Sequence, residues 1–278
     1  MNFHVILASP NDLKKLEEGF QRAVDELDDV KVTVSYGSVH RTPSKIPFLA
    51  YPDARVEASG AGLSNGLTGI IVAQYSDGNK VNIGIPISDS NTGGVASFFS
   101  TSELPPGYDC LTTGIDNAYA ATRMAAEACK RRERVILLDA DAGEGEIERL
   151  AESLDKFGVP YKRLTVPEAG EVNVVLNDHT DHLIRDYDEF LAEHDGVQLV
   201  VNRNSPIADI PGYAHLLDNF SVSGTVGVGR YENAAILAGH LIGLKVHTCA
   251  YRTAKAKDVY SAVPTVFERK MAKELMAE

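Results

Sequence analysis

The feature that most constrains the fold of this chain is an alternation of short apolar segments with amphipathic ones. Phe3 to Ala8 is an apolar run typical of a buried strand, and it ends at the polar turn Ser9-Pro10-Asn11-Asp12. Apolar side chains then recur at helical spacing from Leu13 to Leu27, which predicts a helix directly after the strand. Repetition of this unit predicts an α/β fold with a parallel sheet covered by helices on both faces.

The same alternation continues to the middle of the chain. Further strands are expected at Val30–Tyr36, Val56–Ser59, Val81–Pro86, near Leu111, Arg134–Asp139 and Tyr161–Val166, and further helices at Leu67–Ala73, near Val95–Phe99, and at Asn117–Cys129. This order predicts a three-layer α/β/α sandwich around a flavodoxin-like or Rossmann-like sheet. Ligands of such sheets bind at the carboxyl ends of the strands, so functional residues are expected in the turns that follow them.

The pattern restarts in the second half of the chain. The segment Gly227 to Ala238 echoes Gly114 to Ala121, and Asn233-Ala234 matches Asn117-Ala118. We therefore expect two tandem copies of one α/β unit, because the period is the size of a domain. The expected units are residues 1–130 and 131–250, with a helical tail over 251–278.

Composition narrows the possible partners and compartment. The chain has 278 residues and a formal charge of −12, with no Trp and no Lys/Arg run, which argues against a nucleic-acid surface. Three cysteines without CxxC spacing, Cys110, Cys129 and Cys249, fit a reducing compartment. No segment has the ~20 apolar residues that a bilayer requires, so a soluble, cytoplasmic protein is expected.

The first strand end places a hydroxyl, an amide and a carboxylate at a helix N-terminus. Backbone N–H groups and the helix dipole favour a phosphate there, and Asp12 could hold sugar hydroxyls. We therefore take Ser9, Asn11 and Asp12 as candidate substrate-binding residues. The alternative is an ordinary N-cap, since Ser, Asn and Asp are common caps.

The second strand end reads Gly37-Ser-Val-His-Arg-Thr-Pro43. The guanidinium of Arg41 offers a fork for phosphate, and His40 titrates near neutral pH, so anion binding and proton transfer are possible side by side. Ser38 belongs to the same turn, and Pro43 is expected to begin the next helix. The alternative is an exposed loop with incidental charges.

The third strand end is rich in glycine, with four glycines in the twelve residues from Ala58 to Gly69. Such a turn allows the backbone to approach a flat ligand closely. It is not a dinucleotide-binding fingerprint, because that motif follows the first strand of its unit.

Together the three strand ends resemble the 5-aminoimidazole ribonucleotide (AIR) carboxylase family of purine biosynthesis. That family reads Gly-Ser-x-Ser-Asp, then Ser-Ala-His-Arg-Thr-Pro, then a Gly-rich loop, and the corresponding segments here are Ser9–Asp12, Ser38–Pro43 and Gly60–Gly66. The resemblance covers about residues 3 to 128. It implies a carboxy-lyase that acts on a ribonucleotide.

The third loop is similar to one of the two branches of that family. Gly62 to Leu67 resembles Gly-Arg-Ser-Asn-Gly/Ala-Leu of the branch that uses carbon dioxide directly, and not Ala-Ala-His-Leu-Pro-Gly of the mutase branch. Ile85 to Ser90 is similar to the Pro-Pro-x-Ser-Asp-Ser segment of the carbon dioxide branch. Two departures are Leu63, where that branch has Arg, and Glu103, near where the family has Arg. In addition, His40-Arg41 is more similar to the mutase branch than to the His-Lys of the carbon dioxide branch, and Ala8 stands where the first motif has Gly.

The resemblance implies a role for each candidate residue. Ser9, Ser38 and Arg41 would hold the phosphate with Asn11 beside them, Asp12 would hold the ribose, and His40 would carry the proton that leaves carbon 4 of the imidazole. Ser64 and Asn65 would bind the developing carboxylate, and Gly60, Ala61, Gly62 and Gly66 would line the pocket for the ring and carbon dioxide. No metal or organic cofactor is implied.

The second unit lacks these residues, so we interpret it as a noncatalytic copy. It has Pro167-Glu-Ala-Gly170 in place of the His-Arg turn, and the carboxylates of Asp139 to Gly145 would repel phosphate. We hypothesise that Arg203 or Arg230 restores a cation in a site assembled between subunits. A metal at Asp178-His-Thr-Asp-His182 is disfavoured, because no further ligand cluster is in view.

Three functions stay open, and one assembly is expected. The first function is direct carboxylation of AIR, the second is the mutase that moves a carboxylate from N-carboxy-AIR, and the third is a nucleotide-binding relative without turnover. Because family members of single-unit length form octamers, a tandem chain is expected to form a homotetramer resembling a pseudo-octamer. Neither a nucleic-acid nor a membrane partner is expected.

Overall fold

The computed structural model describes residues 1–49, 51, 54–75, 80–139, 144–177, 181–203, 210–246 and 248. The first half contains β1 (Asn2–Leu7), α1 (Pro10–Glu26), β2 (Lys31–Tyr36), the 3-10 helix η1 (Pro43–Phe48), β3 (Val56–Gly62), α2 (Gly66–Tyr75), β4 (Val81–Ile87), α3 (Val95–Ser102), β5 (Leu111–Thr112) and α4 (Ala118–Ala128). The second half contains β6 (Val135–Leu138), α5 (Glu144–Lys156), β7 (Tyr161–Leu164), β8 (Val172–Asn177), α6 (Asp181–Glu193), β9 (Val197–Asn202), α7 (Ile210–Leu216), the 3-10 helix η3 (Leu217–Asn219), β10 (Ser223–Val228) and α8 (Tyr231–Leu241). The expected tail over 251–278 and Cys249 lie outside the described residues.

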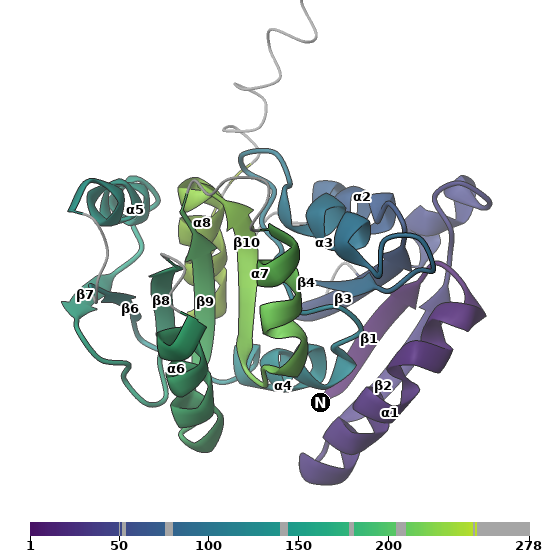
Figure 1. The fold of residues 1–278 in the computed structure, drawn as a ribbon, viewed down its shortest axis with the longest axis horizontal. Helices are drawn as coiled ribbons and strands as arrows, with labels where there is room; N and C mark the ends of the chain where they lie inside the picture. The colour runs from purple at the N-terminus through teal and green to yellow at the C-terminus, as the bar shows by residue number, and fades with distance from the viewer. Residues whose placement is uncertain are drawn as a thin grey trace, which may run out of the picture.

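The strands form one sheet in the order β2-β1-β3-β4-β5-β10-β9-β8-β6-β7, which crosses the whole molecule (Figure 1). Neighbouring strands are parallel except at the centre, where β5 and β10 run antiparallel through the pair Thr112 and Thr225. The two edge strands, β2 and β7, are only partly buried, whereas the inner strands are buried on both faces. This explains why the inner strands are nearly continuous apolar runs.

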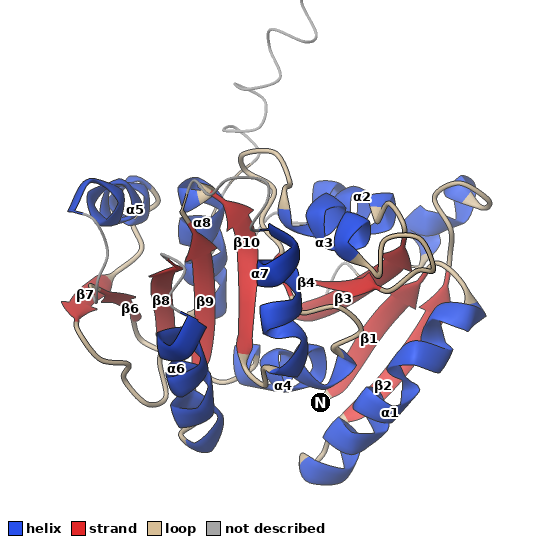
Figure 2. Cartoon of the chain, in the orientation of Figure 1, coloured by secondary structure: helices blue, strands red, loops and turns tan. Residues whose placement is uncertain are grey.

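Helices cover both faces of the sheet (Figure 2). Side chains of α1, α4, α5 and α8 share one core with alternate strand residues such as Val5 and Leu137. The residues between them, such as Ile6 and Ile136, face the opposite layer, which contains α2, α3, α6 and α7. This two-residue alternation confirms the predicted α/β sandwich with a mostly parallel sheet.

Two parts of the sheet differ from the sequence-based expectations. β8, β9 and β10 are not among the expected strands. The third strand was expected to end at Ser59, but β3 continues through Gly60, Ala61 and Gly62, which pair with Ile85 to Ile87 of β4. The physical reason is close contact between the two strands, since a Cβ on Gly60 would lie 2.8 Å from the Ile85 carbonyl oxygen.

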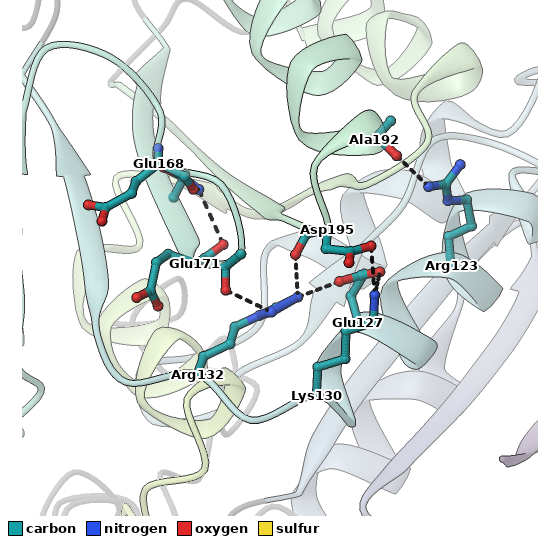
Figure 3. Close-up of polar contacts among 10 residues, drawn as sticks. Arg123, Glu127, Lys130, Arg132, Glu168, Glu171, Ala192 and Asp195 are labelled. Carbon is teal, nitrogen blue, oxygen red and sulfur yellow. Dashed lines mark hydrogen bonds and ion pairs between the residues drawn. The ribbon is translucent and has the colours of Figure 1, made fainter.

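The chain passes from one half to the other through residues 129–134, and charged side chains hold this connection through hydrogen bonds and ion pairs (Figure 3). Arg132 is 5% exposed, and its guanidinium donates to Glu127 Oε2 at 2.5 Å, to the Gly170 carbonyl at 3.1 Å and to the Asp195 carbonyl at 3.2 Å. Lys130 Nζ donates to Glu127 and to Asp195, each at 2.8 Å. These contacts link residues of both halves, so the connecting segment is held in place by both of them.

Candidate active site

A cavity of about 640 Å³ lies where β1, β2, β3 and β4 end. The residues around it come from the turns after these strands and from the first turns of α1 and α2. They are Ala8, Ser9, Asp12, Lys15, Ser38, Val39, His40, Arg41, Ala61, Gly62, Leu63, Ser64, Leu67, Ser88 and Asp89. The carboxyl ends of parallel strands share one edge of a sheet, which is why turns far apart in the sequence meet here.

At the end of β1, Ser9 precedes α1 but makes no capping hydrogen bond to that helix through its side chain. Pro10 occupies the first position of the helix, where a missing N–H costs nothing. The Ser9 hydroxyl therefore lines the cavity without serving as an ordinary N-cap, and Asp12 lies one turn further on. Asn11 is exposed and is not among the described lining residues.

At the end of β2, a tight turn holds Ser38 and presents the two residues that follow Val39. Ser38 is buried, its N–H donates to Thr42 Oγ1 at 3.0 Å, and its carbonyl accepts from the Thr42 N–H at 2.8 Å. His40 and Arg41 are exposed within this turn, and Arg41 Nη2 donates to the Ala8 carbonyl at 3.4 Å. The guanidinium thus bridges the ends of β2 and β1.

Two flanking residues give this turn its shape. A Cβ on Gly37 would lie 2.3 Å from Leu49 Cδ1 and 2.9 Å from Ile46 Cδ1, so any other residue there would have to displace these two side chains. Pro43 begins the next helix as expected, although that helix, η1, is a 3-10 helix. Ile46 of this helix packs in one apolar cluster with Val39, the residue before His40.

At the end of β3, the loop divides into a part that lines the cavity and a part that anchors it. Leu63 has a left-handed backbone (φ +55°), and it is 54% exposed next to Ser64. Asn65 is fully buried: its Nδ2 donates to Thr101 Oγ1 at 2.9 Å, and its Oδ1 accepts from the Thr68 N–H at 3.3 Å. Of the predicted loop residues, Ala61, Gly62 and Ser64 line the cavity, whereas Gly60, Asn65 and Gly66 are not in its described lining.

Two charged residues of the described lining were not among the predicted site residues. Lys15 lies three residues after Asp12 on α1, and its Nζ donates to the Ser88 carbonyl at the end of β4. Asp89 accepts from the Thr92 hydroxyl at 2.5 Å and from the N–H groups of Asn91 and Thr92 at 2.8 Å, and these hydrogen bonds lower the pKa of its carboxyl. The spacing from Asp12 is the one sequence signal that relates Lys15 to the site.

Two cations that we considered for this site bind elsewhere within the chain. Arg203 forms an ion pair with Glu146, and Arg230 Nε lies 3.4 Å from Glu103 Oε2. Glu103 Oε1 also accepts from the Val228 N–H at 2.7 Å. Glu103 therefore connects the first half to the second, which gives this departure from the family pattern a structural role. A contribution of Arg203 or Arg230 to a neighbouring subunit stays a prediction.

Neither a metal cluster nor a membrane-spanning helix is found in the described part of the chain. No group of three or more His, Cys, Asp or Glu side chains there is arranged to hold a metal ion. Residues 178–180 of the segment that we considered as a metal site lie outside the described ranges. Among the described helices, none combines the length and apolar character needed to cross a bilayer.

Comparison with known proteins matches residues 2–138 to the AIR carboxylase family. The N5-carboxyaminoimidazole ribonucleotide mutase of Pyrococcus abyssi is 31% identical over 127 residues, which are 44% of this chain and 70% of that protein. The phosphoribosylaminoimidazole carboxylase of Schizosaccharomyces pombe is 32% identical over 127 residues, again 44% of this chain, but only 22% of that longer protein.

A solved structure was also compared with the whole chain. The C-terminal domain of glucosamine-fructose-6-phosphate aminotransferase from Francisella tularensis aligns with 88% of this chain and 86% of that one, at 9% identity and a TM-score of 0.28. At that score the similarity carries no argument about the site.

Proposed function

Because the chain belongs to the AIR carboxylase family, we propose that it carboxylates AIR directly with carbon dioxide, reversibly and without ATP, to form 4-carboxy-5-aminoimidazole ribonucleotide (carboxy-AIR). The observation that carries this proposal is the cavity at the ends of β1 to β4, which brings Ser9, Asp12, His40, Arg41 and Ser64 together. These side chains offer one binding group for each part of a ribonucleotide and one imidazole for proton transfer.

In this proposal the phosphate binds near the ends of β1 and β2. Arg41 supplies a planar fork of N–H donors, and Ser9 and Ser38 supply hydroxyls beside the N-terminus of α1. Asp12 accepts hydrogen bonds from the ribose hydroxyls. The ring is thereby directed toward the ends of β3 and β4, where Ala61, Gly62 and Leu63 leave room for a flat group.

The reaction requires little from the protein beyond position and one proton transfer. Carbon 4 of the aminoimidazole is an electron-rich enamine carbon, and it forms a bond to the carbon of carbon dioxide while one C–O π bond becomes a carboxylate. His40 then accepts the proton from carbon 4, which restores the aromatic ring. The Ser64 hydroxyl is placed to donate to the new carboxylate.

The mutase is the second candidate, and the name of the Pyrococcus abyssi relative favours it. A mutase must protonate the departing nitrogen and also deprotonate carbon 4, whereas direct carboxylation needs only the second transfer. Of the described lining residues, His40 alone carries an imidazole, and Ser64 stands in the loop where the mutase branch has His. This supports direct carboxylation.

A carboxylation assay with AIR and bicarbonate, without ATP, tests the proposal. The wild type should form carboxy-AIR, and His40→Ala should lower kcat by about 10²- to 10⁴-fold, the usual contribution of a general base. His194→Ala is the matched control, because His194 is an exposed imidazole of the second half with its Nδ1 2.7 Å from the Phe190 carbonyl oxygen.

Two other outcomes would replace the proposal. If the wild type turns over N-carboxy-AIR but not AIR with bicarbonate, the protein is the mutase. If it binds AIR and turns over neither substrate, it is a nucleotide-binding relative without catalysis.

A further inference from the structure

We propose that Lys15 forms a second anion subsite in this cavity, which holds the carboxylate of carboxy-AIR while Arg41 holds the phosphate. The inference rests on the proposed function and goes beyond it, because it assigns a specificity role to a residue on α1. It starts from the observation that the described lining of the cavity contains two cations, Lys15 and Arg41, which come from different elements and lie near different strand ends.

The strand order separates these two cations. Arg41 follows β2, which is the edge strand, and donates to the carbonyl of Ala8 at the end of β1. Lys15 donates to the carbonyl of Ser88, which follows β4. The ends of β1 and β4, where the two cationic groups donate, are two strand spacings apart, or roughly 10 Å. A ligand with two separated anionic groups would therefore meet one cation at each end.

The contacts of Lys15 leave its ammonium able to bind a ligand. An ammonium has three N–H donors, and the Ser88 carbonyl takes one of them. Ser88 itself is fixed, because its N–H donates to Asp116 Oδ1 at 2.9 Å. The side chain of Lys15 thus reaches from α1 to the residue that follows β4, and the apolar Leu63 lines the same cavity.

The charges at this end favour a carboxylate over a phosphate. Asp89 directly follows Ser88 in the lining, and its lowered pKa keeps it ionised at neutral pH. The ionised Asp89 repels a doubly charged group more strongly than a singly charged one, so this end suits a ligand group with a single charge. The β2 end, where Arg41 lies with Ser9 and Ser38, suits the more highly charged phosphate.

Binding of two ligands that differ only in the carboxylate tests the inference. Titration calorimetry should show that Lys15→Ala weakens carboxy-AIR binding by roughly 10- to 100-fold, as expected for loss of a charge-assisted hydrogen bond, and AIR binding by less than about threefold. Lys14→Ala is the matched control, because it removes the same charge from the neighbouring exposed position outside the described lining and should change neither affinity. Lys15→Arg should restore most of the carboxy-AIR affinity.

The possible failures are distinguishable. Equal weakening of both ligands by Lys15→Ala, no weakening of either, or the same loss in Lys14→Ala would overturn the Lys15 subsite while AIR binding by the wild type still supports the proposed function. If the wild type binds neither ribonucleotide, the proposed function and the subsite both fail. Unfolding temperatures of the three variants, measured alongside, should match the wild type.

Discussion

The two halves of this chain share an architecture and differ in the residues at their strand ends. The first half has the strand order β2-β1-β3-β4-β5, and the second has β7-β6-β8-β9-β10, which is the same order of elements. After β2 the first half presents Ser38, His40 and Arg41 to a cavity, whereas after β7 the second half has Pro167-Glu-Ala-Gly170. The buried apolar strands are therefore sufficient to specify the α/β architecture of each half, and the two halves differ in the polar residues of the turns that follow the strands.

The two halves also contact each other through a symmetric pair of asparagines, one from each half. Asn117 of the first half donates from Nδ2 to the carbonyls of Leu217 at 3.0 Å and Phe220 at 2.8 Å, in the second half. Asn233 of the second half donates from Nδ2 to three carbonyls of the first half at 3.1 to 3.3 Å, and its Oδ1 accepts from the Gly107 N–H at 2.8 Å. These are the two asparagines that match in the sequence, which supports the proposal that the halves are copies of one unit.

The largest effect should come from the buried ion pair between Lys80 and Glu57 in the first half. Lys80 Nζ donates to Glu57 Oε2 at 2.8 Å with both side chains almost fully buried, whereas Lys156 donates to Glu232 at the surface of the second half. Lys80→Met should lower the free energy of unfolding by about 3–5 kcal/mol, since it leaves a buried carboxylate without its cation. Lys156→Met should cost about 1 kcal/mol or less. Equal losses in urea denaturation would contradict this contrast between the halves.

The next prediction tests whether Asn117 and Asn233 contribute equally to the contact between the halves. Asn117→Ala and Asn233→Ala should each lower the free energy of unfolding by about 2–3 kcal/mol, because each removes several hydrogen bonds from a buried amide to carbonyls of the other half. Similar losses would sharpen the view that the two residues are equivalent. Asn91→Ala is the control at an exposed loop position, with an expected change within about 0.5 kcal/mol. A large loss in one variant and none in the other would show that only one of these asparagines stabilises the contact between the halves.

The sequence predicts the sheet well where strands are apolar on both faces, as over Val81–Ile87 and Val135–Leu138. It does not predict β10, the strand that joins the halves. A Cβ on Gly224 would lie 2.8 Å from Leu111 Cδ1 and 2.9 Å from the Thr112 carbonyl oxygen, so this strand needs small residues. Its sequence SGTVGV therefore lacks the apolar pattern that identifies the other inner strands.

The residues of the candidate site also differ in how well the sequence predicts their positions. Residues directly after strands, such as Ser38 and Arg41, are predictable because parallel strands end at one edge of the sheet. The inward direction of Asn65 depends on Thr101, a contact between residues 36 positions apart that no local pattern encodes. Lys15 lies in a helix segment rich in Lys and Glu, which has the composition of a solvated surface, and only the fold shows that it reaches the end of β4.

A smaller effect is expected from removing one arginine in each half. Arg41→Ala should raise the KM for AIR by about 10- to 100-fold, because a charge-assisted contact to phosphate is lost. Arg163→Ala removes an arginine on β7 that donates to both Glu148 oxygens at 2.7 and 2.8 Å, and it should leave the KM unchanged. Arg41→Lys should restore part of the affinity, since an ammonium keeps the charge without the planar fork. An unchanged KM in Arg41→Ala would show that Arg41 does not bind the phosphate of AIR.

The smallest effect is a contrast in the pH dependence of stability. Burial would raise the pKa of Glu57, but its hydrogen bond with His4 and the Lys80 ammonium outweigh burial and hold that pKa below its ordinary value. Burial raises the pKa of Asp188 above its ordinary value, although Ser223 and the Ser221 and Val222 N–H groups donate to it.

Glu57 and Asp188 therefore contribute to the pH dependence of stability with opposite signs. The unfolded chain binds more protons at Glu57, so this carboxylate adds stability above about pH 4 and the contribution is lost as the pH falls through its lowered pKa. The folded chain binds more protons at Asp188, so its contribution is full below about pH 4 and is lost as the pH rises through its raised pKa. In urea denaturation from about pH 3 to 6, Glu57→Gln should therefore flatten the rise of stability with pH, and Asp188→Asn should steepen it. If both variants changed the slope in the same direction, the two halves would not differ in how they hold their buried carboxylates.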